Sequence, residues 1–185
     1  MRKAVILALA LLPQAAFAQD IARSAQALEL SATAPANCVV RAVRATGASN
    51  ASFQSSGAAG GQVTITRLVD ADTAEPRATT IDIAIPATCN ASHRVSARSG
   101  QSGLQRLGAA GAQGTGFSEF LPYSIQVEWA GTQLAQASNL GPLAITVPNG
   151  ATGEVALRIA TPAGGTPLVA GQYEDSIVIQ LQPAD

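Results

Sequence analysis

The stretch of sequence that decides the fold is Thr80-Ile81-Asp82-Ile83-Ala84-Ile85-Pro86-Ala87-Thr88-Cys89. Its apolar side chains recur at every second position, which is the period of a β-strand with one buried face. Three of these positions hold isoleucine, whose branched side chain favours extended backbone. The stretch therefore predicts a strand that turns one face, from Ile81 to Cys89, into a hydrophobic core.

The same two-residue period recurs along most of the chain, whereas the spacing typical of an amphipathic helix is absent. Stretches rich in glycine, serine and proline separate the periodic segments and predict turns. About seven short strands without a linker between them predict a single all-β domain, an antiparallel β-sandwich. The residues expected to share a buried face within each further strand are Leu28, Leu30, Ala32 and Ala34; Val63 and Ile65; Leu121, Tyr123, Ile125, Val127 and Trp129; Leu143, Ile145 and Val147; Val155, Leu157 and Ile159; and Ile177, Ile179 and Leu181.

The N-terminal residues have the three-part pattern of a secretory signal peptide. Arg2 and Lys3 precede an apolar run from Ala4 to Leu12, and Ala16-Phe17-Ala18 supplies the small residues that a signal peptidase reads. A run of this length is shorter than the roughly 20 residues that a membrane-spanning helix needs. We therefore predict a signal peptide at residues 1–18, cleavage between Ala18 and Gln19, and an exported chain with no membrane span; the alternative is an N-terminal helix.

The two cysteines, Cys38 and Cys89, allow a single intramolecular pairing. Export would place them in an oxidising compartment, where a disulfide is the expected state. Closing a loop of about 50 residues would stabilise the fold by roughly 4 kcal/mol on the chain-entropy model. We predict a Cys38–Cys89 disulfide, the alternative being two buried free thiols.

The charge balance gives no reason to expect a nucleic-acid or anionic-membrane partner. Without the predicted signal, nine arginines and no lysine face twelve acidic residues, a net charge of −3 with histidine neutral. Charged residues make up 12% of the sequence, about half the usual share. The sequence therefore favours a protein without a basic binding surface.

The residues that catalysis or metal binding would need are almost absent. His93 is the single histidine, so neither a zinc site nor a cysteine–histidine pair is expected, and we predict an exposed histidine at a strand edge. The glycine-rich run 108–116 lacks the lysine of a phosphate-binding loop. Adjacent Glu174 and Asp175 would point to opposite faces of a strand, which is poor geometry for paired acids.

Other polar motifs are weak as well. Asp70, Asp72 and Glu75 are read as a solvated loop, because the glycine and closing glutamate of a calcium loop are missing. Asn50 and Asn90 begin glycosylation sequons to which we assign no role. We therefore predict no enzyme activity, no cofactor and no metal, and a structural or binding role.

Four segments give the chain a family resemblance. They are the first cysteine about twenty residues after the predicted cleavage site, the strand Ile83-Ala84-Ile85-Pro86-Ala87-Thr88-Cys89-Asn90, the strand that contains Leu121-Pro122-Tyr123, and the closing segment Ala170-Gly171-Gln172-Tyr173-Glu174-Asp175-Ser176-Ile177-Val178-Ile179-Gln180-Leu181. In this order and spacing, they make the chain resemble the spore coat protein U domain family. That family includes subunits of archaic chaperone–usher pili of Gram-negative bacteria.

The resemblance implies an immunoglobulin-like sandwich, spanning residues 38–185, that lacks its last strand. It implies that a periplasmic chaperone lends a strand first, and that the N-terminal extension of a neighbouring subunit replaces it at an outer-membrane usher. The extension would be residues 19–37, with Leu28, Leu30 and Ala32 as donor-strand residues; Leu28–Ala34 as the domain's own first strand remains an alternative. The closing strand and the edge of the acceptor groove would be formed by Tyr173, Asp175, Ile177, Ile179 and Leu181.

Two functions follow as expectations. The first is a structural subunit of a surface pilus, fimbria or coat that supports adhesion or biofilm formation, located in the periplasm and then at the cell surface. The second is a free-standing secreted or periplasmic module that binds carbohydrate or protein. The second function would need exposed aromatic side chains in a cleft, for which only Trp129, Tyr123, Tyr173 and four phenylalanines, one of them in the predicted signal, are available.

Overall fold

The computed structural model describes residues 29–57, 60–109 and 116–184. The chain divides into two units, Met1–Ala34 and Pro35–Asp185. In the first unit, the described residues 29–34 have no regular secondary structure, and Leu30 is 94% exposed. The predicted signal peptide, its cleavage site at Ala18 and Gln19, and Leu28 lie outside the described residues. Within the described parts there is no helix long and apolar enough to cross a membrane.

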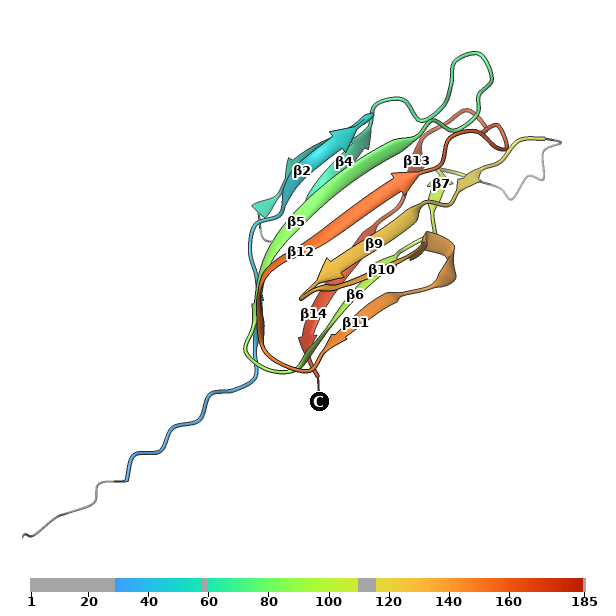
Figure 1. Cartoon of the computed structure of the whole chain (residues 1–185). Coiled ribbons are helices and arrows are strands. Elements are labelled where there is room, and N and C mark those ends of the chain that lie inside the picture. Colours follow the sequence, from blue (N-terminus) through green and yellow to red (C-terminus); the bar gives the residue numbers. More distant parts are fainter. Residues whose placement is uncertain (1–28, 58–59, 110–115, 185) are drawn as a thin grey trace, which may run out of the picture. The chain divides into compact units, whose positions relative to one another are not determined.

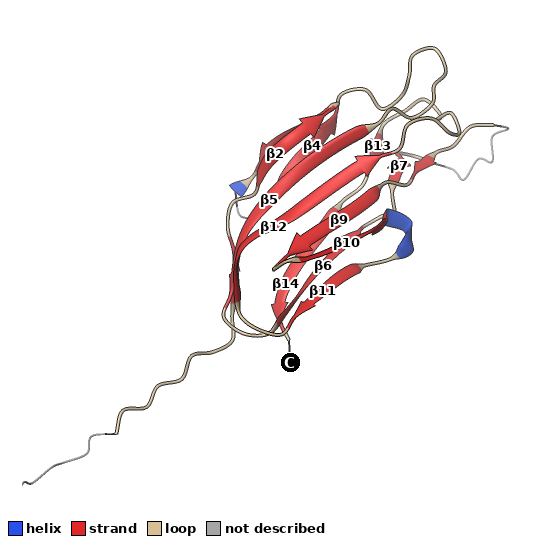
Figure 2. Ribbon diagram, in the orientation of Figure 1, coloured by secondary structure: helices blue, strands red, loops and turns tan. Residues whose placement is uncertain are grey.

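The regular secondary structure of the second unit is almost entirely β-strand (Figures 1 and 2). Its described residues also include a short 3₁₀ turn, η2 (Ser138–Leu140). The strands in chain order are β1 (Cys38–Val40), β2 (Arg44–Ser49), β3 (Ala51–Ser55), β4 (Gly61–Ile65), β5 (Thr79–Cys89), β6 (His93–Ser99), β7 (Leu104–Arg106), β8 (Phe120–Leu121), β9 (Ser124–Trp129), β10 (Thr132–Ala137), β11 (Leu143–Val147), β12 (Ala151–Thr161), β13 (Tyr173–Glu174) and β14 (Ile177–Pro183).

The larger layer is a six-stranded antiparallel sheet in which β5 pairs with three other strands. Its strands run in the order β1-β5-β12-β9-β10, and β2 pairs with the same edge of β5 as β1 does. β5 and β12 stay paired over eleven residues, from Thr79 opposite Thr161 to Cys89 opposite Ala151. The stretch that predicted a strand from its sequence is therefore an interior strand of the sheet, paired along both of its edges.

Pro86 lies within β5 although proline cannot donate to a sheet ladder. The Arg41 N–H donates to the Pro86 carbonyl at 2.9 Å, so the backbone groups of Pro86 face the side of β1 and β2. β1 ends at Val40 and β2 begins at Arg44, which leaves an interruption opposite Pro86. The missing N–H therefore falls where the neighbouring strand is broken, and the pairing with β12 is unaffected.

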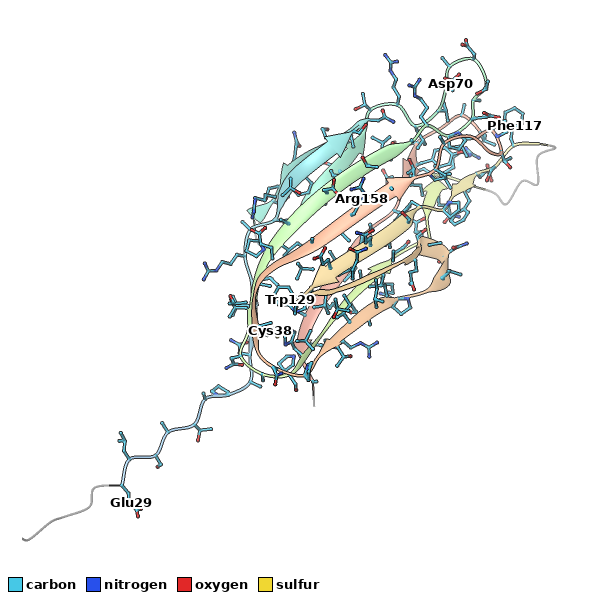
Figure 3. The ribbon with its side chains drawn as sticks, viewed as in Figure 1. Glu29, Cys38, Asp70, Phe117, Trp129 and Arg158 are labelled. Atoms are coloured by element: carbon cyan, nitrogen blue, oxygen red, sulfur yellow. A yellow bond between two sulfur atoms is a disulfide. The ribbon has the colours of Figure 1, made fainter. Side chains whose placement is uncertain are left out.

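The second layer is the three-stranded antiparallel sheet β11-β6-β14. Interior-facing side chains of the two layers form one core, and the most deeply buried include Val95, Val127 and Val155, each at 0% exposure. The outer face of the larger sheet is polar: Arg158 on β12 pairs with Asp82 on β5 at 3.2 Å (Figure 3). The predicted all-β, antiparallel β-sandwich is thereby confirmed.

Two small sheets complete the unit. The hairpin of β3 and β4 adds Phe53 and Val63, which lie opposite each other in register, to the edge of the core. β13, β7 and β8 form a short three-stranded sheet. Asn50, in the turn between β2 and β3, has a φ of 58° and accepts the Arg67 N–H through its side chain at 3.0 Å. This asparagine of a predicted sequon thus has a structural role.

The closing strand β14 has the predicted register. Ile177, Ile179 and Leu181 face the core, whereas Val178 is 42% exposed and Gln180 is exposed. Among the segments with a predicted strand, the described residues 29–34 form none, and the first strand of the domain is β1 at Cys38. The central strand of the second sheet, β6, was not predicted.

We predict that Ile179→Asp lowers the free energy of unfolding by roughly 3 kcal/mol, because it places a carboxylate against the core. Gln180→Asp, one position along the same strand, should change it by less than about 0.5 kcal/mol, because Gln180 faces solvent. Urea unfolding of both variants measures the difference. Equal destabilisation would contradict the register.

Candidate functional site: the open side of the sandwich

The edge strand β14 leaves one side of the sandwich incompletely covered. It pairs with β6 from Ile177 opposite Ser99 to Pro183 opposite His93, and no described residue pairs with its other edge. Ile177, Ile179 and Leu181 are only partly buried, whereas the interior residues of β6, Val95 and Ala97, are 0% and 1% exposed. Side-chain burial therefore falls from the middle strand β6 of this sheet to its β14 edge.

The larger sheet also has incompletely buried aliphatic side chains near β1. Val40 on β1 lies opposite the buried Ala87 of β5 and so shares its interior-facing side, yet Val40 is 40% exposed. Val43, in the interruption between β1 and β2, is partly buried against the core. We call these five aliphatic residues the open-side cluster: Val40, Val43, Ile177, Ile179 and Leu181.

The other two predicted closing-strand residues, Tyr173 and Asp175, make contacts away from the open-side cluster. Tyr173 on β13 lies opposite Arg106 of β7, and its hydroxyl is 2.8 Å from the Val169 carbonyl and 3.0 Å from that of Ser118. A hydroxyl has one proton, so it donates to one of these carbonyls at a time. Tyr173 therefore ties β13 to the loops beside it.

Asp175 accepts four hydrogen bonds just before β14 begins. Its Oδ2 accepts from the Ser99 hydroxyl and, at 2.7 Å, from the Tyr123 hydroxyl. Its Oδ1 accepts the backbone N–H groups of Gln101 at 2.8 Å and Ser176 at 2.7 Å. This carboxylate thus fastens the start of β14 to the end of β6 and to the residue before β9, and it joins two of the segments that carried the family resemblance.

This network perturbs the Tyr123 phenol, which is 4% exposed. Burial raises the pKa of Tyr123 well above its ordinary value of 10.0, and the nearby Asp175 carboxylate raises it further, while Ser99 acts in the opposite direction. Burial also raises the pKa of Tyr173. Both phenols are therefore neutral hydrogen-bond donors at any physiological pH.

The Cys38–Cys89 disulfide joins β1 to the end of β5, as predicted (Figure 3 labels Cys38). Beyond it, Asn90 continues the pairing: its side chain accepts the Asn37 N–H at 2.7 Å and donates to the Pro35 carbonyl at 2.9 Å. These bonds explain why the compact unit begins at Pro35, three residues before the domain start predicted at Cys38. The second sequon asparagine therefore also has a structural role.

His93 is completely buried, so the predicted exposed histidine is wrong. The Trp129 indole N–H, which can only donate, lies 2.6 Å from Nε2 of His93, so Nε2 is the acceptor. Nδ1 then carries the proton and donates to the Ala91 carbonyl at 2.8 Å. The rings meet edge to face, and Trp129 is 2% exposed. Sequence reasoning missed this pair because hydrophobic periodicity does not register a buried polar contact.

The described residues contain no group of three histidine, cysteine or acidic side chains able to hold a metal ion. Two shallow hollows, of about 260 and 310 Å³, flank Gly153 on β12. The first is lined in part by Trp129, but that ring is turned into the core. The hollows therefore offer little aromatic surface to a ligand.

No protein-family model, no curated protein and no solved structure matches this chain.

We predict that stability falls at alkaline pH because of Tyr123. A raised folded-state pKa contributes stability that is fully present below pH 10 and is lost as the pH rises above it. Tyr123→Phe should cost about 1–3 kcal/mol at neutral pH, since it removes a hydrogen bond to a carboxylate, and should weaken the loss above pH 10. Urea unfolding at pH 7–11 measures both effects. An unchanged alkaline slope in Tyr123→Phe would contradict the assignment.

Proposed function

We propose that this chain is an exported structural subunit of a surface pilus, fimbria or coat, assembled through a chaperone–usher pathway. Its biological role would be to support adhesion or biofilm formation. The observation that supports the proposal is the open side of the sandwich, where β14 has no second strand partner among the described residues and its aliphatic side chains are only partly buried.

An added strand would satisfy both deficits of the open side. Unpaired backbone groups along a sheet edge are a template for another chain. Full burial of an aliphatic side chain contributes about 1.5–3 kcal/mol, so completing the burial of the open-side cluster would contribute several kcal/mol. A sandwich that ends in this way is more stable with a partner strand than without one.

The proposed occupant is the N-terminal extension, residues 19–37, of a neighbouring subunit. Leu28, Leu30 and Ala32 alternate along it and would share one face of an inserted strand. Leu30 is 94% exposed in its own chain, so it is not committed to that chain's core. The disulfide and Asn90 hold the domain together from Pro35 onward, so the preceding residues are not needed for its pairing. A periplasmic chaperone and an outer-membrane usher would be the earlier partners.

The alternative of a free-standing binding module has less support. It requires exposed aromatic side chains in a cleft. Trp129 and Tyr123 are 2% and 4% exposed, and Phe117, which is 50% exposed, lines neither hollow. The hydroxyl groups of Tyr123 and Tyr173 are engaged within the domain.

We predict that Leu28→Ser combined with Leu30→Ser prevents polymer growth without unfolding the domain. The serines would bring unpaired hydroxyls into an apolar site and forfeit roughly 2 kcal/mol of burial for each leucine. Light scattering after size-exclusion chromatography should show polymers for the parent chain and none for the variant. Glu29→Ser, on the opposite face of the same segment, is the matched control and should polymerise like the parent.

Mixing gives a second readout of the same variant. It retains the open-side cluster but lacks a working donor, so it should terminate chains and shorten parent polymers in proportion to the amount added. The Glu29→Ser control should not shorten them. If the double variant polymerises like the parent, assembly through this segment is wrong.

A further inference from the structure

β10, an end strand of the larger sheet, has no strand partner on its outer edge among the described residues. This strand pairs with β9 from Thr132 opposite Trp129 to Ala137 opposite Ser124, without a break in register. Residues 132–135 are all exposed.

The ladder shows which backbone groups of β10 are free. The Ser138 N–H donates to the Tyr123 carbonyl at 2.7 Å, and these residues continue the same register. In an antiparallel ladder, only every second residue bonds to a given neighbour. Leu134 therefore bonds to β9 with Thr132 and Gln136, while the backbone groups of Gln133 and Ala135 point out of the sheet.

β10 lacks the features that protect sheet edges from pairing. It contains no charged residue, no proline and no bulge. By contrast, β2 contains Arg44 and a register shift between Ala45 and Gly47, and β14 ends in Pro183. The outer edge of β10 is therefore uncharged and regular in register over six residues.

Leu134 supplies this edge with a partly exposed apolar side chain that a partner could bury. It lies opposite Val127, which is 0% exposed, so it shares the interior-facing side of the sheet, yet it is 43% exposed itself. β11, an end strand of the second sheet, differs from β10, because its interior residues Leu143 and Ile145 are 3% and 2% exposed. Of β10 and β11, β10 therefore leaves more interior-facing apolar surface exposed to solvent.

We infer that β10 is a dimerisation edge that pairs antiparallel with β10 of a second copy of this chain. A twofold axis at Leu134 places Leu134 opposite Leu134 and Gln133 opposite Ala135. The outward backbone groups of Gln133 and Ala135 then bond to one another, and Leu134 falls at a non-hydrogen-bonded pair, where side chains approach most closely. Shifting the register by two residues would instead oppose Leu134 with Thr132 or Gln136.

The edge fits a second copy because nothing in it repels itself. An uncharged strand can lie against its twofold image without opposing like charges. Such an interface is isologous and closes at two chains. The contact is small, so one pair is weak, and it would strengthen where many copies are held close together, as in the polymer proposed above.

Cysteine cross-linking tests the pairing and its register. The native cysteines are bonded to each other, so a single added thiol reports on contacts between chains. Leu134→Cys in the full chain should form a covalent dimer under mild oxidation, seen on a non-reducing gel. Val178→Cys is the matched control, because Val178 is 42% exposed and also lies on an end strand. It should give several-fold less dimer, and equal or absent dimer in both variants would overturn the inference.

Ala135→Pro removes an N–H that points away from β9, so the ladder within the domain stays intact. Added to Leu134→Cys, it should reduce the dimer yield several-fold, whereas Ala135→Ser, which keeps the N–H, should not. Circular dichroism checks that the variants are folded. Undiminished cross-linking in a folded proline variant would overturn the inference. The result is independent of the N-terminal donor, because polymers joined only through the open side would not oppose Leu134 with itself.

Discussion

The eleven-residue antiparallel pairing of β5 with β12 is the contact on which the rest of the domain depends. β5 is paired on both edges, since β1 and β2 follow its other side, and one of its faces supplies Ile81, Ile83 and Ile85 to the core. The disulfide is attached to its last residue, and the one proline within it faces the interruption between two partner strands. A substitution that displaces the backbone of β5 would therefore disturb its pairing with β1, β2 and β12.

Periodicity predicted this part of the fold because its interior is aliphatic. β5, β9, β11, β12 and β14 all place branched or large apolar residues inside, so alternation in the sequence matches alternation in space. β6 was not predicted, and neither were β1, β2 and β10 of the larger sheet, although β6 is the middle strand of the second sheet. Its interior positions include His93 and Ser99, which look solvent-exposed by composition. The structure makes them interior by giving each a hydrogen-bond partner, Trp129 and Asp175.

In the candidate site too, apolar alternation and the cysteine pairing were predictable from the sequence, whereas the polar contacts were not. The register of Ile177, Ile179 and Leu181 follows from the closing segment alone, and the disulfide follows from a single possible pairing. The Asp175 network does not, because its partners Tyr123 and Ser99 lie 52 and 76 residues away in sequence. Asn50 and Asn90 were likewise readable only as sequons, since their side chains bond to segments distant along the chain. Long-range polar contacts leave no periodic signal.

The edge strands β14 and β10 differ in how much apolar surface they leave uncovered, and this difference affects how copies of the chain would associate. Among the described residues, the outer edge of β14 has no strand partner and its core side chains are only partly buried. A strand that joined it would gain burial as well as hydrogen bonds, and a partner that donated a different segment would produce an open, head-to-tail chain. The β10 edge carries no charge that would repel its own twofold image, and it offers one leucine that is 43% exposed. Pairing there closes at two copies and cannot extend. Growth along one direction and pairing across it would thus rest on separate strands, at opposite ends of the same core.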